Sequence, residues 1–238
     1  MIEIKNLTIS FDGKSVLENI DLNIQKNRIT TIVGQSGCGK SVLMKAIEGI
    51  IKPDTGTILI DGIDIFSLNK KELITVRKKM AMLFQGSALL DSLNVYQNVA
   101  LPLIEHSSLS EDQVKEMVSE KLELVGLSGV LDKMSSELSG GMKKRVALAR
   151  AIILKPDYII YDEPTTGLDP IIAQEIIKLI LKLQSSYKLT SIIVTHDMDC
   201  INKVKGNIIM IRDKKIIFDG IYDDFKNASD SFVKKFLK

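Results

Sequence analysis

The chain begins with alternating apolar and polar positions, which is the pattern of strands that bury one face. Residues 2–10 and 17–24 follow this alternation on either side of an Asp-Gly turn at 12–13. The pattern predicts antiparallel strands at the N-terminus. A second hairpin is predicted at 58–65, where short apolar runs flank another Asp-Gly pair.

Short, almost wholly apolar runs recur farther along the chain. Such runs are typical of parallel strands that are buried on both faces. The predicted strands of this kind are 28–33, 80–84, 158–161 and 191–195. Two more apolar runs at 208–211 and 215–218 indicate a closing hairpin.

Apolar positions three or four residues apart predict helices between these strands. One helix begins at Ser110 with a capping box closed by Gln113. Its expected buried face is Val114, Met117, Val118, Leu122 and Val125. Asp169 and Pro170 suit the N-cap and first turn of another helix. Further helices are predicted at 40–49, 69–79 and 143–154.

Strands alternate with helices at both ends of the chain, whereas the middle is helical. This order predicts one α/β domain with an antiparallel N-terminal sheet. We expect a core made of residues 1–86 and 157–238 and a helical insert at 87–156.

Composition narrows the class of protein. The 238 residues are 45% hydrophobic, with 32 basic and 30 acidic side chains and a net charge of +2, so we expect no nucleic-acid partner. No apolar run reaches the ~18 residues of a membrane span, and no apolar targeting segment follows Met1. The two cysteines cannot form a disulfide framework, and we expect a reduced, cytosolic protein.

One segment carries a nucleotide-binding motif. Residues 34–41 read Gly-Gln-Ser-Gly-Cys-Gly-Lys-Ser and match G-x-x-x-x-G-K-[ST] between a predicted strand and helix. Its glycines let backbone N–H groups approach phosphates, and the positive end of the next helix faces the β-phosphate. Lys40 would bridge the β- and γ-phosphates, and Ser41 would ligate Mg²⁺. A plain glycine-rich turn is the alternative.

An acidic pair, Asp162-Glu163, follows the apolar strand 158–161. Carboxylates at the end of a buried parallel strand lie at the edge of the sheet where ligands bind. Acidic pairs at strand ends also cap helices, which is the alternative interpretation.

A third segment, Leu138-Ser139-Gly140-Gly141, opens the predicted helix at 143–154 and forms another helix N-terminus with small residues. The acidic pair continues as Pro-Thr-Thr-Gly-Leu-Asp at 164–169. Together with the phosphate-binding loop at 34–41 (the P-loop), these segments make the chain resemble an ATP-binding-cassette (ABC) ATPase from end to end. In that family, residues 138–142 would be the ABC signature. The resemblance implies a P-loop ABC ATPase core, an antiparallel β subdomain and a helical signature subdomain.

The resemblance also implies a role for each site residue. Glu163 is expected to be the general base, His196 to contact the γ-phosphate and Lys40 to hold it. Ser41, Gln85 and Asp162 are expected at Mg²⁺. The expected ATP contacts are Phe11, Val16, Gly34, Gln35, Ser36, Gly37, Cys38, Gly39, Lys40, Ser41, Val42, Gln85, Ser139, Gly140 and Gly141.

Two of these positions, Phe11 and Cys38, and the neighbouring Met142 need a separate interpretation. Phe11 is placed like the aromatic residue that stacks on adenine, although a core Phe on a strand is the alternative. Cys38 is interpreted as a small buried filler that would react with thiol reagents. Met142 replaces the glutamine most common at the end of the signature, so a side-chain contact to the nucleotide would be lost there.

In this family the signature faces the nucleotide of the other subunit, so the resemblance implies a head-to-tail homodimer or paired cassettes. The cassette carries no predicted span, so integral-membrane permease subunits are expected as partners on the cytoplasmic side of the inner membrane. The apolar segment 86–103 is expected to form their docking groove.

The alternatives are a soluble ABC ATPase of the iron–sulfur assembly type and a P-loop kinase, which would lack the signature. Segments 83–95 and 137–151 look like the ATPases of Mce/Mla-type phospholipid transporters. That likeness implies lipid transport with an Mce-type lipid-binding subunit, and an amino-acid importer is the closest transporter alternative.

Overall fold

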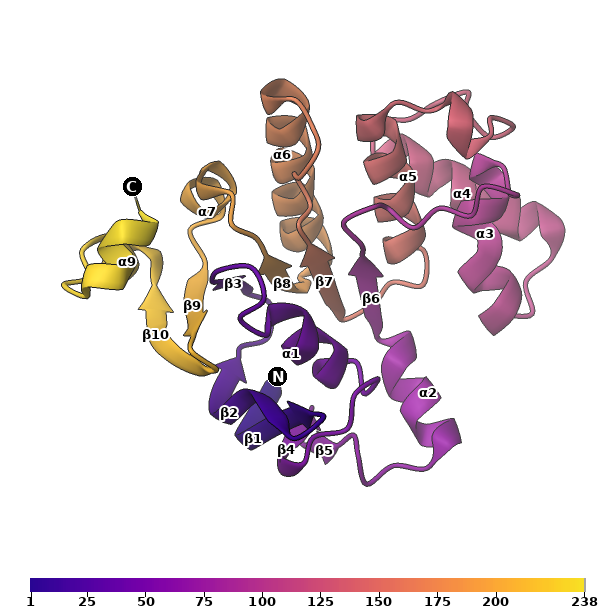
Figure 1. The fold of residues 1–238 in the computed structure, drawn as a ribbon. Coiled ribbons are helices and arrows are strands. Elements are labelled where there is room, and N and C mark those ends of the chain that lie inside the picture. Colours follow the sequence, from indigo (N-terminus) through magenta and orange to yellow (C-terminus); the bar gives the residue numbers. More distant parts are fainter. Residues whose placement is uncertain (238) are drawn as a thin grey trace.

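The computed structural model describes residues 1–237 and contains two β-sheets with helices between and around them (Figure 1). The smaller sheet is antiparallel, with strand order β2-β1-β4-β5. Its strands are β1 (Ile2–Phe11), β2 (Lys14–Ile24), β4 (Thr55–Ile60) and β5 (Ile63–Asp64). The two predicted N-terminal hairpins are therefore confirmed, and their alternating apolar positions form the buried face.

The larger sheet has the strand order β10-β9-β3-β8-β7-β6, in which only β10 runs antiparallel to its neighbour. Its strands are β3 (Ile29–Val33), β6 (Met80–Leu83), β7 (Tyr158–Asp162), β8 (Thr190–Val194), β9 (Asn207–Arg212) and β10 (Lys215–Ile221). The buried apolar runs all form strands of this sheet. Because β3, β6, β7 and β8 are parallel, the loops that follow them meet at one edge.

The helices lie between and around the two sheets. They are α1 (Lys40–Ile47), α2 (Lys70–Lys78), α3 (Val95–His106), α4 (Glu111–Leu124), α5 (Gly140–Ile152), α6 (Pro170–Tyr187), α7 (Met198–Val204), α8 (Tyr222–Lys226) and α9 (Ser231–Phe236). The capping box of Ser110 with Gln113 is confirmed, as is Asp169 at the N-cap of α6. No helix was predicted at α7, α8 or α9.

The core has separate parts on the two faces of the larger sheet. Helix α1 lies between the two sheets, and its apolar side chains pack against both. The opposite face is covered by α6, and the core continues from there into α3, α4 and α5. In Figure 1 these three helices lie together beside α6 and β6. The boundaries expected for a helical insert at 87 and 156 stay a prediction.

The C-terminal helices α8 and α9 pack on β9 and α7 at the far edge of the larger sheet. Phe225 of α8 is fully buried and meets the rings of Phe218 and Phe236 edge to face. Arg212 lies over the ring of Phe232 at 4.1 Å. Within residues 1–237, no helix has the length and apolar character needed to cross a membrane.

Candidate functional site

A cavity of about 550 Å³ lies where the loops after β3, β6, β7 and β8 meet. Its lining residues come from segments far apart in the sequence. They are Val16, Gly34, Gln35, Ser36, Gly37, Gly39, Lys40, Ser41, Val42, Gln85, Asp162, Glu163, Val194, His196 and Phe236. Most of the nucleotide and metal residues expected from the sequence are therefore brought together in one place.

The P-loop forms one wall of this cavity, between the end of β3 and the first turn of α1. Gly37 and Gly39 have φ angles of 79° and 104°, which side chains other than glycine rarely adopt. A Cβ at Gly39 would lie 2.7 Å from Cδ2 of Leu17, so the space is also closed. The loop is thus held in a conformation that exposes its N–H groups, as phosphate binding requires.

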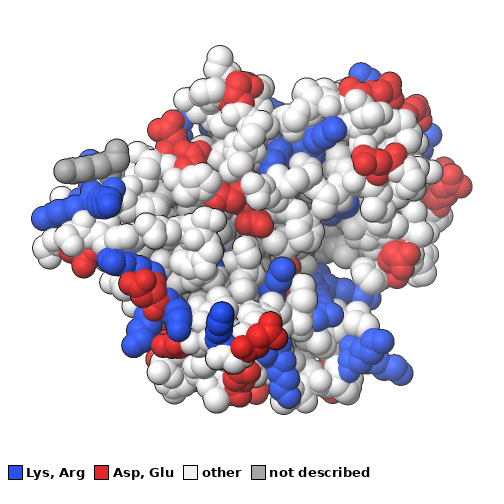
Figure 2. All heavy atoms as spheres, in the orientation of Figure 1, with Lys and Arg blue, Asp and Glu red and all other residues white. Residues whose placement is uncertain are grey.

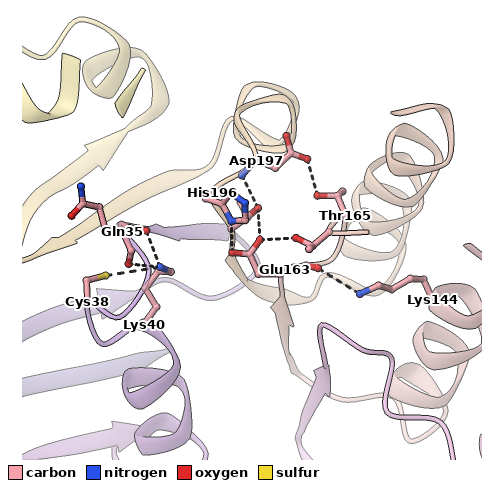
Figure 3. A network of polar contacts seen from close by, with 11 residues as sticks. Gln35, Cys38, Lys40, Lys144, Glu163, Thr165, His196 and Asp197 are labelled. Carbon is pink, nitrogen blue, oxygen red and sulfur yellow. Dashed lines mark hydrogen bonds and ion pairs between the residues drawn. The ribbon is translucent and has the colours of Figure 1, made fainter. Parts of the chain in front are cut away.

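The ammonium of Lys40 lies inside this loop. Its Nζ donates hydrogen bonds to the backbone oxygens of Gly34 at 2.8 Å and Gln35 at 2.9 Å. The Sγ of Cys38 lies 3.9 Å from the same nitrogen (Figure 3). The cation is therefore held at the cavity wall by neutral oxygens. Among residues 1–237, no carboxylate forms an ion pair with it.

Glu163 lies opposite, just beyond β7, in an unusual backbone conformation. Its φ angle is 47°, and its N–H donates to the backbone oxygen of Val194 at 2.8 Å. Positive φ at a non-glycine residue costs free energy, on the order of 1–3 kcal/mol, and such residues cluster at functional sites. The turn aims the carboxylate into the cavity.

The Glu163 carboxylate is fixed by side chains from two loops (Figure 3). Its Oε1 lies 2.7 Å from Nδ1 of His196, and its Oε2 accepts hydrogen bonds from Thr166 at 3.1 Å and Thr195 at 3.3 Å. The Glu163 side chain is only 12% exposed, whereas His196 is 66% exposed. A buried, oriented carboxylate beside an open imidazole is suited to accept a proton from a water molecule.

Asp162, the residue before it, is half-buried. Burial, followed by the neighbouring Glu163 charge, raises the pKa of the Asp162 carboxyl. A carboxylate of this kind is stabilised by a cation, and the hydroxyl of Ser41 and the amide of Gln85 line the same cavity. A site with oxygen ligands and only one or two carboxylates suits Mg²⁺, because this ion keeps waters and phosphate oxygens among its ligands. The residues present therefore fit a magnesium ion.

Two residues of this region were missed by the sequence analysis. Lys144 of α5 is 3% exposed, and its Nζ contacts backbone oxygens on both sides of the cavity's floor, those of Gln85 and Glu163. Phe236 of α9 lines the cavity beside the loop residues. Lys144 lies within the basic run Lys143-Lys144-Arg145, so no local pattern indicated that it is buried, and none indicated Phe236.

Phe11 and Cys38 are not among the residues that line this cavity. Phe11 lies at the end of β1 and is 45% exposed, so its contact with adenine stays a prediction. Cys38 lines a neighbouring cavity of about 340 Å³ with Ile211 and Lys214. The thiol is half-buried there, which is compatible with the small filler expected at this position.

The signature residues lie outside the cavity, at the N-terminus of α5. Ser139 is the N-cap and accepts a hydrogen bond from the N–H of Met142 at 3.3 Å. Gly141 packs against Ile172 so closely that a Cβ would lie 2.6 Å from Cγ2 of that residue. Met142 packs partly against the apolar core. The signature does not line this chain's own cavity, so its contact with ATP stays a prediction that needs a second chain.

Charges of both signs are interspersed over the face drawn in Figure 2. Lys and Arg side chains alternate there with Asp and Glu, in agreement with the small net charge. Attraction of an anionic ligand is therefore local and depends on the P-loop amides and Lys40.

Comparison with known proteins agrees with this geometry. A family model described as "ABC transporter" matches residues 17–166. The chain is 44% identical over 238 residues to the "Intermembrane phospholipid transport system ATP-binding protein MlaF" of Haemophilus influenzae, covering 100% of this chain and 90% of that protein.

Two further matches are a second relative by sequence and a solved structure. The chain is 39% identical over 236 residues to the "Probable ribonucleotide transport ATP-binding protein mkl" of Mycobacterium leprae, covering 99% of this chain and 68% of that protein. A dimeric ATP-binding cassette, MJ0796, solved in a post-hydrolysis state with ADP and Pi, superposes with a TM-score of 0.85 at 31% identity, covering 93% of this chain and 99% of that one.

Proposed function

The chain belongs to the ABC transporter family, and from that membership we propose that it is the ATPase subunit of a membrane transporter for phospholipids. As a cassette of this family it binds and hydrolyses ATP. The observation that carries the proposal is the convergence of the P-loop, Asp162, Glu163 and His196 on one cavity.

The triphosphate of ATP would lie along the P-loop, with its anionic oxygens near the loop amides and Lys40. A γ-phosphate near Lys40 replaces the neutral carbonyls of Gly34 and Gln35 as the partner of the ammonium. Ser41, Asp162 and Gln85 would hold Mg²⁺, which neutralises charge on the phosphate oxygens when bound.

Glu163 is the residue suited to activate the attacking water. Its Oε1 and Oε2 are both oriented, so the carboxylate accepts a proton without first losing rotational freedom. His196 shares Oε1 and is exposed toward the cavity, so it orients the base and reaches toward the γ-phosphate. The strained backbone of Glu163 fixes this direction.

The subunit acts as a dimer, as the cassette structure that it resembles does. Because its signature lies away from its own cavity, we propose that Ser139, Gly140 and Gly141 complete the nucleotide site of a second chain. Each dimer then holds two ATP molecules between P-loop and signature.

A separate groove of about 570 Å³ suits the permease partner. Apolar side chains form most of it, and Phe84 and Leu90 are each nearly half exposed there. Its rim is basic. The cationic side chains that line it are Arg77, Lys78 and Arg150, and the imidazole of His106 lies in the same lining. We propose that a cytoplasmic helix of the permease, apolar with acidic residues, docks in this groove.

The expected docking segment at 86–103 needs a correction. Only part of it reaches the groove, through Ala88 and Leu90 of the loop and Leu101 and Pro102 of α3. Val95 and Val99 are buried in the core of the helical region instead, because α3 turns that face inward. The rest of the groove comes from α2, β6 and α5.

Phospholipid is the substrate class that we propose, with an Mce-type lipid-binding subunit as an additional partner and the cytoplasmic side of the inner membrane as the location. The similarity to MlaF covers the whole chain and supports this choice over amino-acid import and iron–sulfur assembly. Ribonucleotide transport is the second candidate, because the M. leprae relative bears that name.

Co-purification with the permease tests the assembly. Leu90→Asp should abolish recovery of the permease while ATP binding persists, because it places a charge in the groove and leaves the P-loop intact. Ile104→Asp is the matched control, since Ile104 is 60% exposed on α3 and does not line the groove. Equal recovery with both variants would contradict the docking site.

Transport by the purified complex tests the substrate. The complex in liposomes should move labelled phospholipid in an ATP-dependent manner, and Glu163→Gln should stop this movement. ATP-dependent movement of a ribonucleotide with none of lipid would favour the second candidate instead.

A further inference from the structure

A lysine is buried between the signature helix and the nucleotide site. Lys144 lies one turn into α5 and is 3% exposed. Its Nζ lies 2.6 Å from the backbone oxygen of Gln85, 3.4 Å from that of Phe84 and 3.5 Å from that of Glu163. One ammonium therefore touches the loop after β6 and the turn after β7 (Figure 3 shows the contact with Glu163).

This arrangement satisfies the donors of the ammonium but does not neutralise it. An ammonium has three N–H donors, and all of its partners here are neutral carbonyl oxygens. Burial lowers the pKa of Lys144, and the nearby charges of Asp162 and Glu163 oppose that shift. A buried cation next to these two carboxylates contributes to the field in which Mg²⁺ and water are held.

A second cation of α5 shows what Lys144 adds. Arg150 donates to the backbone oxygens of Ser87 at 2.9 Å and Ala88 at 2.8 Å, two residues with positive φ. The loop after β6 is therefore attached to α5 independently of Lys144. Lys144 adds a different contact: its ammonium joins this loop and the signature helix α5 to the backbone of Glu163.

We propose that Lys144 is a positioning residue that couples the two nucleotide sites of the dimer through the chain. The N-terminus of α5 carries the signature, which meets the partner's ATP, and Lys144 on the same helix holds the backbones of Gln85 and Glu163 in its own site. A shift of α5 on the partner's ATP therefore moves the general base and the metal-binding loop together. This inference rests on the proposed dimer.

The test compares variants of the full chain in steady-state ATP hydrolysis and equilibrium ATP binding. Lys144→Met keeps the apolar length of the side chain and removes the ammonium. We expect kcat to fall by about tenfold or more, because small displacements of catalytic groups cost this much. The dissociation constant of ATP should change less than about threefold, and the Hill coefficient for ATP should fall toward 1.

Two further variants separate coupling from general damage. Lys144→Arg keeps the charge and the donors and should restore at least half of kcat and the cooperativity. Lys121→Met is the matched control. Within residues 1–237, Lys121 is the other buried lysine, and it is bonded to Glu120 at 2.8 Å and Tyr187 at 3.1 Å. Its loss should lower thermal stability without changing the Hill coefficient.

Normal kcat and cooperativity in folded Lys144→Met would overturn the proposal, and so would Lys144→Arg that is as impaired as Lys144→Met. If Lys144→Met does not fold, Lys144→Gln decides by the same two criteria. The wild type is measured first. If its ATP hydrolysis is not cooperative, the result counts against the proposed dimer and not against the role of Lys144.

Discussion

At the scale of single residues, the site combines one restrained anion with one restrained cation. Glu163 is held through both carboxylate oxygens, and Lys40 is held by two loop carbonyls. Both side chains face the same cavity, so a γ-phosphate and a water molecule would meet groups that are already oriented. Such preorganisation removes the entropic cost of aligning them during the reaction.

Glu163→Gln tests the base. Glutamine keeps the shape and one accepting oxygen, but it cannot take a proton from water. Turnover should fall by ~10²–10⁴, the usual contribution of a positioned acid–base group. ATP binding should persist, so an ATP-dependent dimer should accumulate in size-exclusion chromatography with ATP and Mg²⁺.

Lys40→Ala is the comparison for this experiment. It removes the cation that meets the phosphates, so it should fail to bind ATP and should not dimerise with nucleotide. Hydrolysis by Glu163→Gln within a factor of a few of the wild type would contradict the base assignment. His196 and Gln85 would then be the next groups to examine.

Residue types and short spacings were sufficient to predict most of the residues that line this cavity. The P-loop, the acidic pair and His196 each follow a recognisable strand, and the parallel sheet then brings those strand ends together. Lys144 and Phe236 were not predictable in this way. Their roles depend on which helix packs over which loop, and that is decided by contacts between segments far apart in sequence.

At the scale of elements, one buried side chain shapes the loop between β6 and α3. Asn98 is 1% exposed, and its Oδ1 accepts a hydrogen bond from the N–H of Leu90 at 2.8 Å. Its Nδ2 donates to the backbone oxygens of Leu90, Leu93 and Asn94, all within 3.1 Å. The amide therefore fixes the loop that carries Leu90 into the proposed docking groove.

Asn98→Leu should lower the free energy of unfolding by about 1–3 kcal/mol, because it leaves buried backbone groups without partners. Urea titration followed by circular dichroism measures this change. Glu105→Ala on the exposed face of the same helix should stay within about 0.5 kcal/mol of the wild type. An equal effect of the two variants would show that the amide does not organise the loop.

The elements themselves followed their local periodicity. The helix beginning at Ser110 has Val114, Val118, Leu122 and Val125 buried, as its spacing predicted. Segment 86–103 was expected to form the docking groove, but part of it is buried, because an apolar composition does not distinguish a docking surface from a core face. That distinction depends on the neighbouring helices, which have no signature in the segment itself.

At the scale of the whole molecule, a carboxylate joins the two sheets. Asp61, in the turn between β4 and β5, accepts hydrogen bonds at 2.7 Å from Tyr158 at the start of β7 and from Lys26 after β2. Burial would raise its pKa, but hydrogen bonds from Lys26, the N-terminal amine and Tyr158 outweigh burial and hold the pKa of Asp61 far below its usual value.

This pairing predicts a pH-dependent contribution to stability. A depressed folded-state pKa stabilises the fold above the unfolded-state pKa of about 4, and the contribution is lost as pH falls below that value. Asp61→Asn should therefore lower the free energy of unfolding by about 1–3 kcal/mol at pH 7. The difference from wild type should narrow below pH 4 in denaturant titrations. Asp54→Asn, at an exposed carboxylate at the opposite end of β4, should show no such narrowing.

The dimer makes a separate prediction about the signature. A Cβ at Gly140 would lie 3.4 Å from Leu168, an ordinary contact, so Gly140→Asp should fold. Its carboxylate would repel the partner's phosphates, and hydrolysis should fall by at least about 10²-fold while ATP binding persists.

Mixing inactive variants provides the decisive control. A dimer of one Gly140→Asp chain and one Lys40→Ala chain has one site with an intact P-loop and an intact signature. Hydrolysis should therefore recover in the mixture although neither variant is active alone. No recovery in a demonstrated mixed dimer would show that the signature does not act in the partner's site.

The strand order of the larger sheet also affects how the chain is made. β3 lies in the middle of that sheet, and its two neighbours, β8 and β9, come much later in the sequence. The hydrogen bond from the N–H of Asn27 to the hydroxyl of Thr190, for example, spans 163 residues. At ribosomal rates of 5–20 residues per second, β3 waits roughly 8–30 s for these neighbours. The smaller sheet needs only residues 2–64 and can pair much earlier. Nascent chains halted before β8 should therefore expose the unpaired backbone edges and the apolar side chains of β3. They should recruit chaperones that release them once β8 has emerged.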